Sequence, residues 1–215
     1  NSLPITILLT SASFASMRDV THLGIFGIAE FSNIPNLVII SPSSKEELLS
    51  ALDWSVEQRE HPVMILMPGN EVNSREQILS IGELDKFELT QKGEKLAIIG
   101  LGGFYQKSEG LAKAVEEKYG FRPTLINPRF ASGIDKELLD SLAENHKLVI
   151  TLEDGILAGG FGQKVASHLG TSNLKVKNYG LEKKFYDRYN AKALLRELGM
   201  DDESILNDIK EMLSL

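Results

Sequence analysis

The fold class follows from residues 37–47, Leu37-Val38-Ile39-Ile40-Ser41-Pro42-Ser43-Ser44-Lys45-Glu46-Glu47. The first four residues are apolar and mostly β-branched, which is typical of a strand buried in a parallel sheet. Ser44 and Glu47 then have the spacing of a capping box, in which the serine hydroxyl accepts from the Glu47 amide and the glutamate reaches back. Apolar residues recur at helical spacing as far as His61-Pro62, where proline disfavours helix. A strand followed directly by an amphipathic helix is the repeating unit of an α/β fold.

The same alternation continues on both sides of this stretch. Short β-branched runs at 5–9 and 63–67 predict further strands of the first unit, and residues 70–94 are polar and punctuated by glycine, which predicts a linker carrying a hairpin. A second series predicts strands at 96–101, 123–127, 148–152 and 174–178, helices at 108–119, 135–145 and 160–169, and two terminal helices at 191–198 and 203–213. The sequence therefore predicts two units, 1–69 and 95–215, joined by the linker.

Composition and charge exclude several classes of protein. The 215 residues are 42% hydrophobic and 25% charged, and their net charge of −7 argues against a nucleic-acid or anionic-membrane surface. Without cysteine there is no disulfide and no thiolate metal site, and the four histidines show no metal-ligand spacing. No apolar run approaches the roughly 20 residues of a membrane helix, so we expect a soluble, cytoplasmic protein. Because the chain starts at Asn1 and enters a strand at once, we expect it to be part of something longer.

Two glycine-rich turns are candidate anion sites. The first, Gly100-Leu101-Gly102-Gly103-Phe104-Tyr105, lies between a predicted strand and helix, as a dinucleotide-binding turn does, but Tyr105 replaces the third glycine. The second follows Glu153-Asp154 at 159–162 and opens a helix, whose free amides can hold an anion. For both turns we favour a structural interpretation, as a tight turn in an α/β unit and as close packing of a helix. The two carboxylates would repel a phosphate, and we expect Glu153 and Asp154 to cap the helix or pair across an interface.

His22 is the candidate for acid–base chemistry. It lies in the loop after the first predicted strand, where α/β proteins place ligands, and its side chain titrates near neutral pH. A packed or surface histidine remains the alternative interpretation. His61, His146 and His168 each adjoin or lie in a predicted helix and are interpreted as structural.

Several motifs recur in a characteristic order along the chain. They are the segments 3–9, 21–27 and 34–43 in the first unit, and 93–99, 125–130, 149–155 with 159–162, and 179–181 in the second. This series resembles the transketolase group of thiamine-diphosphate enzymes, and within it the 1-deoxy-D-xylulose-5-phosphate synthases. The first unit is similar to the second half of the pyrimidine-binding domain, and the second unit to the transketolase C-terminal domain.

The resemblance implies a fold, a cofactor and partners. A partial parallel-sheet pyrimidine-binding domain at 1–69 would precede a C-terminal domain at 95–215, whose sheet is mixed and mainly parallel and whose surface contributes to a homodimer. Thiamine diphosphate and Mg²⁺ would serve the full-length enzyme. The glutamate that activates the cofactor and the Gly-Asp-Gly domain that binds its diphosphate lie upstream in the family, so we expect this chain alone to bind no cofactor, to need those domains or a partner subunit, and to be inactive.

The resemblance also assigns three site residues. His22 matches the histidine of the family's Thr-His-Gln-Gly motif, which faces the reactive carbon of the cofactor, and it is expected to be catalytic. Asp19 and Ser11 are expected to contact substrate. Asp19 is displaced by one position from the family's aspartate, which falls at Arg18, and Leu23 stands in place of the family's glutamine.

Two arginines that bind the sugar phosphate in the family are missing, with Ser11 and Gly69 in their places. Neither residue replaces a bidentate guanidinium. The resemblance implies condensation of pyruvate with glyceraldehyde 3-phosphate. Two alternatives remain open, the C-terminal subunit of a split transketolase and a non-catalytic dimerisation module.

Overall fold

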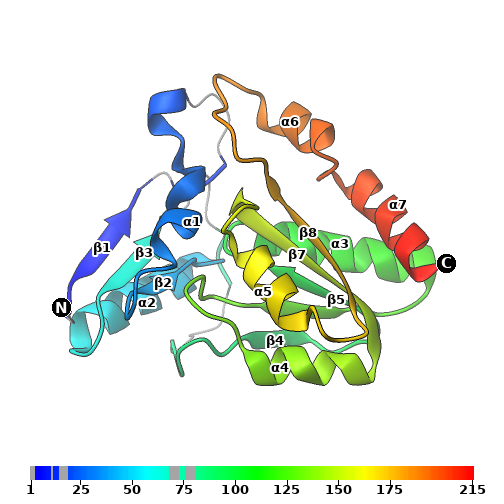
Figure 1. Ribbon diagram of the computed structural model, residues 1–215, viewed down its shortest axis with the longest axis horizontal. Helices are drawn as coiled ribbons and strands as arrows, with labels where there is room; N and C mark the ends of the chain where they lie inside the picture. The colour runs from blue at the N-terminus through cyan, green and yellow to red at the C-terminus, as the bar shows by residue number, and fades with distance from the viewer. Residues whose placement is uncertain (1–2, 11, 15–18, 68–72, 76–80) are drawn as a thin grey trace.

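Two α/β units pack side by side in the molecule (Figure 1). The computed structural model describes residues 3–10, 12–14, 19–67, 73–75 and 81–215. The first unit holds a three-stranded sheet and the second a five-stranded sheet, and the two chain ends lie at opposite sides of the view. The predicted α/β class is therefore confirmed.

The first unit is a parallel sheet with strand order β1-β3-β2. All three strands lie where the β-branched runs predict them, at β1 (Thr6–Leu9), β2 (Val38–Ile40) and β3 (Val63–Leu66). Two short 3₁₀ turns, η1 (Val20–His22) and η2 (Gly24–Phe26), lead from β1 into helix α1 (Gly27–Phe31), and helix α2 (Lys45–Glu57) follows β2.

The capping box at the start of α2 forms with one change. The Ser44 hydroxyl accepts from the Glu47 amide at 3.2 Å, as the sequence predicts. The Glu47 carboxylate reaches back one residue further than expected, to the Ser43 amide at 2.6 Å and the Ser43 hydroxyl at 2.8 Å. The Ser44 contact satisfies a backbone donor that the first helical turn leaves open, and the Glu47 contact satisfies the Ser43 amide just before the helix.

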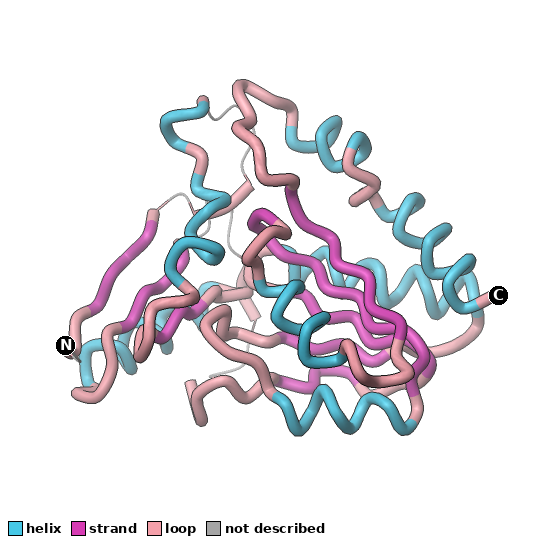
Figure 2. Tube along the Cα trace, in the orientation of Figure 1, coloured by secondary structure: helices cyan, strands magenta, loops and turns pink. Residues whose placement is uncertain are grey.

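The second unit is a mixed sheet, mainly parallel, in the order β4-β6-β5-β7-β8. Its strands form the larger group of magenta segments in Figure 2. Only β4 runs antiparallel, against β6. This architecture confirms the mixed, mainly parallel sheet that the family resemblance implies. Its strands are β4 (Glu88–Gln91), β5 (Lys95–Gly100), β6 (Thr124–Asn127), β7 (His146–Ile156) and β8 (Lys175–Leu181).

Helices cover both faces of the second sheet. On one face α3 and α7 pack through Leu111, Val115 and Ile205 against strand residues such as Leu96 and Ile150. The other face is covered by α4 and α5, whose Leu139 and Val165 share a core cluster with Ile99. The helices are α3 (Phe104–Tyr119), α4 (Lys136–Ser141) with the 3₁₀ turn η3 (Leu142–Glu144), α5 (Phe161–Leu169), α6 (Ala191–Glu197) and α7 (Asp202–Leu213). None of the helices in the described part of the chain is long and apolar enough to cross a membrane.

Three elements differ from the sequence prediction. Strand β4 lies inside the stretch 70–94 that was predicted as a linker with a hairpin, and it pairs with β6 instead. Strand β7 continues beyond the predicted 148–152 as far as Ile156, through an irregularity in its pairing with β8 that carries two carboxylates. Helix α3 starts at Phe104, before the predicted residue 108, because Phe104 and Tyr105 are buried on its core face.

The two units share backbone pairing as well as side-chain contacts. After β6 the chain crosses to the free edge of β2, where Ile40 and Phe130 form an antiparallel bridge. The Ser41 amide donates to the Arg129 carbonyl at 2.7 Å, and the Ala131 amide donates to the Ile39 carbonyl at 2.9 Å. The first sheet is thereby extended by residues that belong to the second unit.

Candidate functional site

The His22 loop, defined as residues 19–26, brings two of the predicted site residues together. Asp19 caps η1, where its carboxylate accepts from the Thr21 amide at 2.9 Å and also from the Thr21 hydroxyl. His22 Nδ1 lies 2.7 Å from the Thr21 hydroxyl oxygen and 3.4 Å from Asp19 Oδ1. The hydrogen bonds from Thr21, its hydroxyl first, lower the pKa of Asp19 below its ordinary value.

These contacts fix the proton on the His22 ring. An ionised Asp19 only accepts hydrogen bonds, so the Thr21 hydroxyl must donate its one proton to Asp19. His22 Nδ1–H then donates to the Thr21 hydroxyl oxygen, and Nε2 takes no part in these contacts. The His22 side chain is 71% exposed. The loop therefore presents an exposed imidazole whose Nε2 is not engaged by Thr21 or Asp19.

The second unit holds the His22 loop in place. Ile25 is buried in an apolar cluster, here called the anchor cluster, which consists of Phe14, Ile25, Ile156, Leu181, Tyr186 and Leu194. Leu23 and Phe26 pack against the same cluster, and the Phe26 ring meets the exposed Phe185 edge-on at 5.7 Å. His22 is thus carried by the first unit, but its loop rests on the β7, β8 and α6 region of the second.

The carboxyl ends of strands from both units meet beneath this loop. Ser13 and Ser41 follow β1 and β2, and Gly103 and Asp154 lie at the end of β5 and within β7. They line a cavity of about 10 Å³, together with Ala12, Ile28 and Leu66. A space of that size holds one water molecule.

Glu153 and Asp154 have the capping and interface roles that the sequence allowed. Glu153 is buried and accepts from the Phe161 and Gly162 amides at the start of α5, each at 2.8 Å. Burial raises the pKa of Glu153 to about 7, and the two amide hydrogen bonds oppose part of that rise. Asp154 accepts from the Phe14 amide at 2.5 Å, across the boundary between the units, and burial raises its pKa to about 6.

Neither glycine-rich turn fits a diphosphate. At Gly102, whose φ is +56°, an added Cβ would lie 2.2 Å from the Ser41 hydroxyl, so the turn is filled by the first unit. At the second turn Glu153 already occupies the amides of α5. Among the described residues, no group of three His, Asp or Glu side chains is arranged to hold a metal. The amides at the start of α5 are therefore taken by Glu153, and Gly102 lies against Ser41.

The remaining sequence-predicted residues divide into two groups. Ser11 and Gly69, the positions of the missing arginines, lie outside the described residues. Two of the histidines interpreted as structural have partners within the fold. His146 contacts the Thr124 hydroxyl at 2.8 Å and the Leu142 carbonyl at 2.9 Å, and His168 pairs with Asp140 at 2.7 Å.

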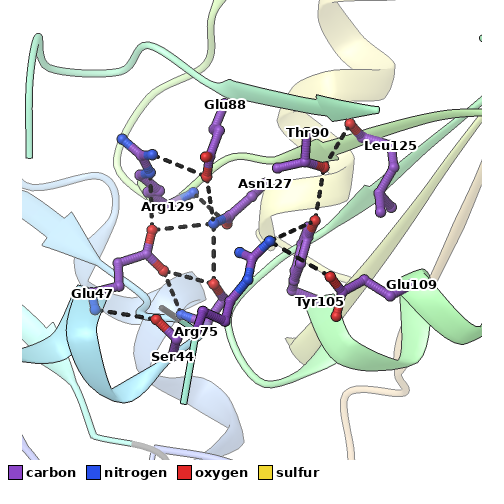
Figure 3. A network of polar contacts seen from close by, with 11 residues as sticks. Ser44, Glu47, Arg75, Glu88, Thr90, Tyr105, Glu109, Leu125, Asn127 and Arg129 are labelled. Atoms are coloured by element: carbon purple, nitrogen blue, oxygen red, sulfur yellow. Dashed lines mark hydrogen bonds and ion pairs between the residues drawn. The ribbon is translucent and has the colours of Figure 1, made fainter. Parts of the chain in front are cut away.

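Sequence reasoning missed a buried polar network between the units (Figure 3). Glu47, which is fully buried, faces Arg129 Nε at 2.9 Å and the Asn127 amide at 3.1 Å. The other end of the Arg129 guanidinium pairs with Glu88 on β4 at 3.0 Å. The sequence signal was present in the capping-box glutamate and in the motif 125–130, but the two are far apart along the chain. Only the fold shows that they meet.

The comparisons with known proteins agree with this architecture. Residues 85–205 match the family model described as "Transketolase, C-terminal domain". A 1-deoxy-D-xylulose-5-phosphate synthase of Clostridium tetani is 30% identical over 99% of this chain and 34% of its own length. The same synthase of Clostridium perfringens (strain SM101) is 33% identical over 99% of this chain and 35% of its own. The chain spans about a third of the length of the curated relatives it matches.

Two solved structures share the fold. One is a split gene transketolase, described as an inactive beta4 tetramer, with a TM-score of 0.85 and 22% identity over 100% of this chain and 68% of its own. The other is a transketolase mutant from Pichia stipitis, with a TM-score of 0.74 and 16% identity over 98% of this chain and 30% of its own. At these identities the similarity concerns the fold alone.

Proposed function

The chain belongs to the family of transketolase C-terminal domains, and on that premise we propose that it is part of a thiamine-diphosphate-dependent transferase. The reaction we assign joins the two-carbon unit of pyruvate to glyceraldehyde 3-phosphate and yields 1-deoxy-D-xylulose 5-phosphate. The substrates are those implied by the name of the curated relatives, which align with 99% of this chain. The observation that carries a catalytic role is the Asp19–Thr21–His22 arrangement, which leaves Nε2 of an exposed imidazole open.

His22 is assigned to proton transfer at the acceptor. When the new carbon–carbon bond forms, the aldehyde oxygen of the acceptor becomes a hydroxyl and must gain a proton. His22, protonated at Nε2, donates that proton to the oxygen and regains one from solvent, and the carboxylate of Asp19 stabilises the imidazolium form. Thiamine diphosphate, when bound, supplies the electron sink for loss of carbon dioxide from pyruvate. Asp19 and Ser11 are proposed to contact the acceptor.

The proposal assigns cofactor binding to parts of the enzyme other than the residues described here. The assignment is supported by the close contact of Gly102 with the Ser41 hydroxyl and by the Glu153 carboxylate on the Phe161 and Gly162 amides. The working enzyme is proposed to be a cytoplasmic homodimer. The isolated chain, mixed with thiamine diphosphate, Mg²⁺ and pyruvate, is expected to release no carbon dioxide. Release of carbon dioxide at a rate above that of the cofactor alone would contradict the assignment of cofactor binding to other parts of the enzyme.

A second candidate is a subunit of a split transketolase. It is favoured by the fold similarity to the split gene protein, of which this chain covers 68%. The donor substrate distinguishes the two: the synthase takes pyruvate, whereas a transketolase takes a ketose phosphate. Assaying the complete enzyme with each donor, and glyceraldehyde 3-phosphate as the common acceptor, decides between them. Failure to bind or convert any of these substrates would favour a non-catalytic dimerisation module, a reading to which Ser11 and Gly69 in place of the family's arginines lend support.

A further inference from the structure

We infer that Asp154 is a positioning residue for His22, acting from the second unit by holding the chain segment that leads into the His22 loop. The inference rests on the proposed function, in which His22 transfers a proton. Asp154 is not expected to touch the substrate. Its task is to fix where the loop lies.

The contact that carries the inference crosses the boundary between the units. Asp154 Oδ1 accepts from the Phe14 amide at 2.5 Å, and the two residues are 140 positions apart in the chain. The Ser13 hydroxyl also donates to Asp154. The second carboxylate oxygen faces Gly103, where an added Cβ would lie 3.6 Å away. A charged acceptor makes a hydrogen bond of this kind about twice as strong as a neutral one does.

Phe14 is held by its side chain as well as by its amide. The Phe14 ring stacks on Tyr189 with centroids 4.9 Å apart and planes within 12°. Phe14 and Ile25 both belong to the anchor cluster, so the second unit holds the chain before and after His22. Between these two points of attachment the His22 side chain is 71% exposed, and its polar contacts in the described structure are with Thr21 and Asp19 of its own loop.

The attachment points have different physical character. At Ile25 the loop is held by apolar burial, which has no preferred direction. At Phe14, which precedes the loop in the chain, the backbone is held by a short hydrogen bond, which fixes its direction. Because a displacement of about 1 Å at a reacting group can cost a hundredfold in rate, loss of this directional contact is expected to lower the rate.

The test compares Asp154→Ala with Asp154→Asn in the complete enzyme, with Asp140→Ala as control. Asn keeps an acceptor for the Phe14 amide, and Asp140 is an exposed carboxylate that pairs with His168 on another part of the surface. Asp154→Ala is expected to make hydrogen exchange of the amides at 13–14 and 19–26 roughly tenfold faster. Asp154→Asn should restore most of the protection, and Asp140→Ala should leave it unchanged. Unchanged exchange in Asp154→Ala would overturn the inference.

Steady-state kinetics test whether Asp154 acts through His22. Asp154→Ala is expected to lower kcat by about tenfold or more with little change in KM for pyruvate. Introduced into a His22→Ala background, the same substitution should have almost no further effect. An equal loss in both backgrounds would show that Asp154 acts independently of His22, which contradicts the inference.

The hydrogen-exchange and kinetic measurements also distinguish a failure of this inference from a failure of the proposed function. If His22→Ala itself left turnover unchanged, the role of His22 would be wrong, while the exchange data would still report whether Asp154 holds the loop. If Asp154→Ala did not fold, Tyr189→Leu would replace it, because that change removes the ring on which Phe14 stacks. It should then give the same pattern of faster exchange at 13–14 and 19–26, and its absence would count against the inference.

Discussion

Arg129 carries the polar contact between the units from an unusual backbone conformation. Its φ is +58°, in the left-handed region that residues with a Cβ seldom occupy. From there its carbonyl accepts from Ser41, and its guanidinium spans Glu47 and Glu88. The strained backbone lets one residue serve both units. Arg129 thereby compensates a carboxylate that has no exposed surface.

Removing Arg129 should therefore cost more than removing its partner. Arg129→Met leaves Glu47 buried without its ion-pair partner, and we expect a loss of about 3–5 kcal/mol in the free energy of unfolding. Glu47→Gln should cost less, since Arg129 keeps Glu88 at 3.0 Å. Chemical denaturation of both variants and of the double variant checks this. The double variant should be more stable than Arg129→Met, and a simple sum of the two losses would contradict the account.

Glu153 should make stability depend on pH. Its pKa is about 7 in the folded protein against an ordinary 4.5, so the folded state binds this proton more tightly than the unfolded state. The contribution of Glu153 to stability therefore falls as pH rises from about 4.5 to 7 and is constant above that. The total fall is about 3 kcal/mol. Unfolding of wild type and Glu153→Gln from pH 4 to 8 should show a flatter profile for the variant; parallel profiles would refute this.

At the scale of elements, the sequence predicts the helices and strands that have an apolar, periodic pattern. It misses strands that are short or polar. Strands β1, β2 and β3 are β-branched runs that stand out without any tertiary information. Strand β4 has one large apolar side chain, Leu89, which is 44% exposed at the sheet edge, so it carries little signal of its own. The extension of β7 to Ile156 was missed for a different reason. Its Glu153 is polar by sequence but buried because the helix amides of α5 satisfy it.

At the same scale, replacing two helical glycines with alanine should change stability in opposite directions. In α3, a Cβ added at Gly110 meets nothing within 4 Å, so Gly110→Ala should stabilise the protein by about 0.5–1 kcal/mol. In α5, a Cβ added at Gly162 would lie 2.4 Å from the Thr151 hydroxyl and 2.9 Å from Asn178 Cγ. Gly162→Ala should therefore lower the melting temperature while Gly110→Ala raises it. Equal shifts in the same direction would contradict the packing described for α5.

At the scale of the whole molecule, the two units form one folding unit. A single core cluster includes Ile39 and Leu66 from the first sheet and Ile99, Val149 and Phe161 from the second unit. Backbone pairing at Ile40 and Phe130 adds to it. We therefore expect one cooperative transition, with the fluorescence of Trp54 in the first unit and the overall circular dichroism changing together on denaturation. Two separated transitions would show that the units unfold independently.

Contacts between distant parts of the chain limit how much of the site could be predicted from the sequence. His22 and Asp19 were both predicted as site residues, and the structure places His22 Nδ1 3.4 Å from Asp19 Oδ1. Their catalytic and binding roles stay predictions. The contact between Asp154 and Phe14 could not be predicted, because 140 residues separate the two and nothing in either local sequence points to the other. Long-range packing determines where the His22 loop lies, and the local sequence determines which polar side chains the loop presents.

Steady-state kinetics test most directly whether His22 transfers a proton in the proposed transketolase-like synthase. The complete enzyme would be assayed with pyruvate and glyceraldehyde 3-phosphate as wild type, as His22→Ala, and as His168→Ala, a control histidine that pairs with Asp140. We expect kcat of His22→Ala to fall by about 10²–10⁴-fold and kcat of the control to stay unchanged. A His22→Ala enzyme that turns over at the wild-type rate would contradict the account.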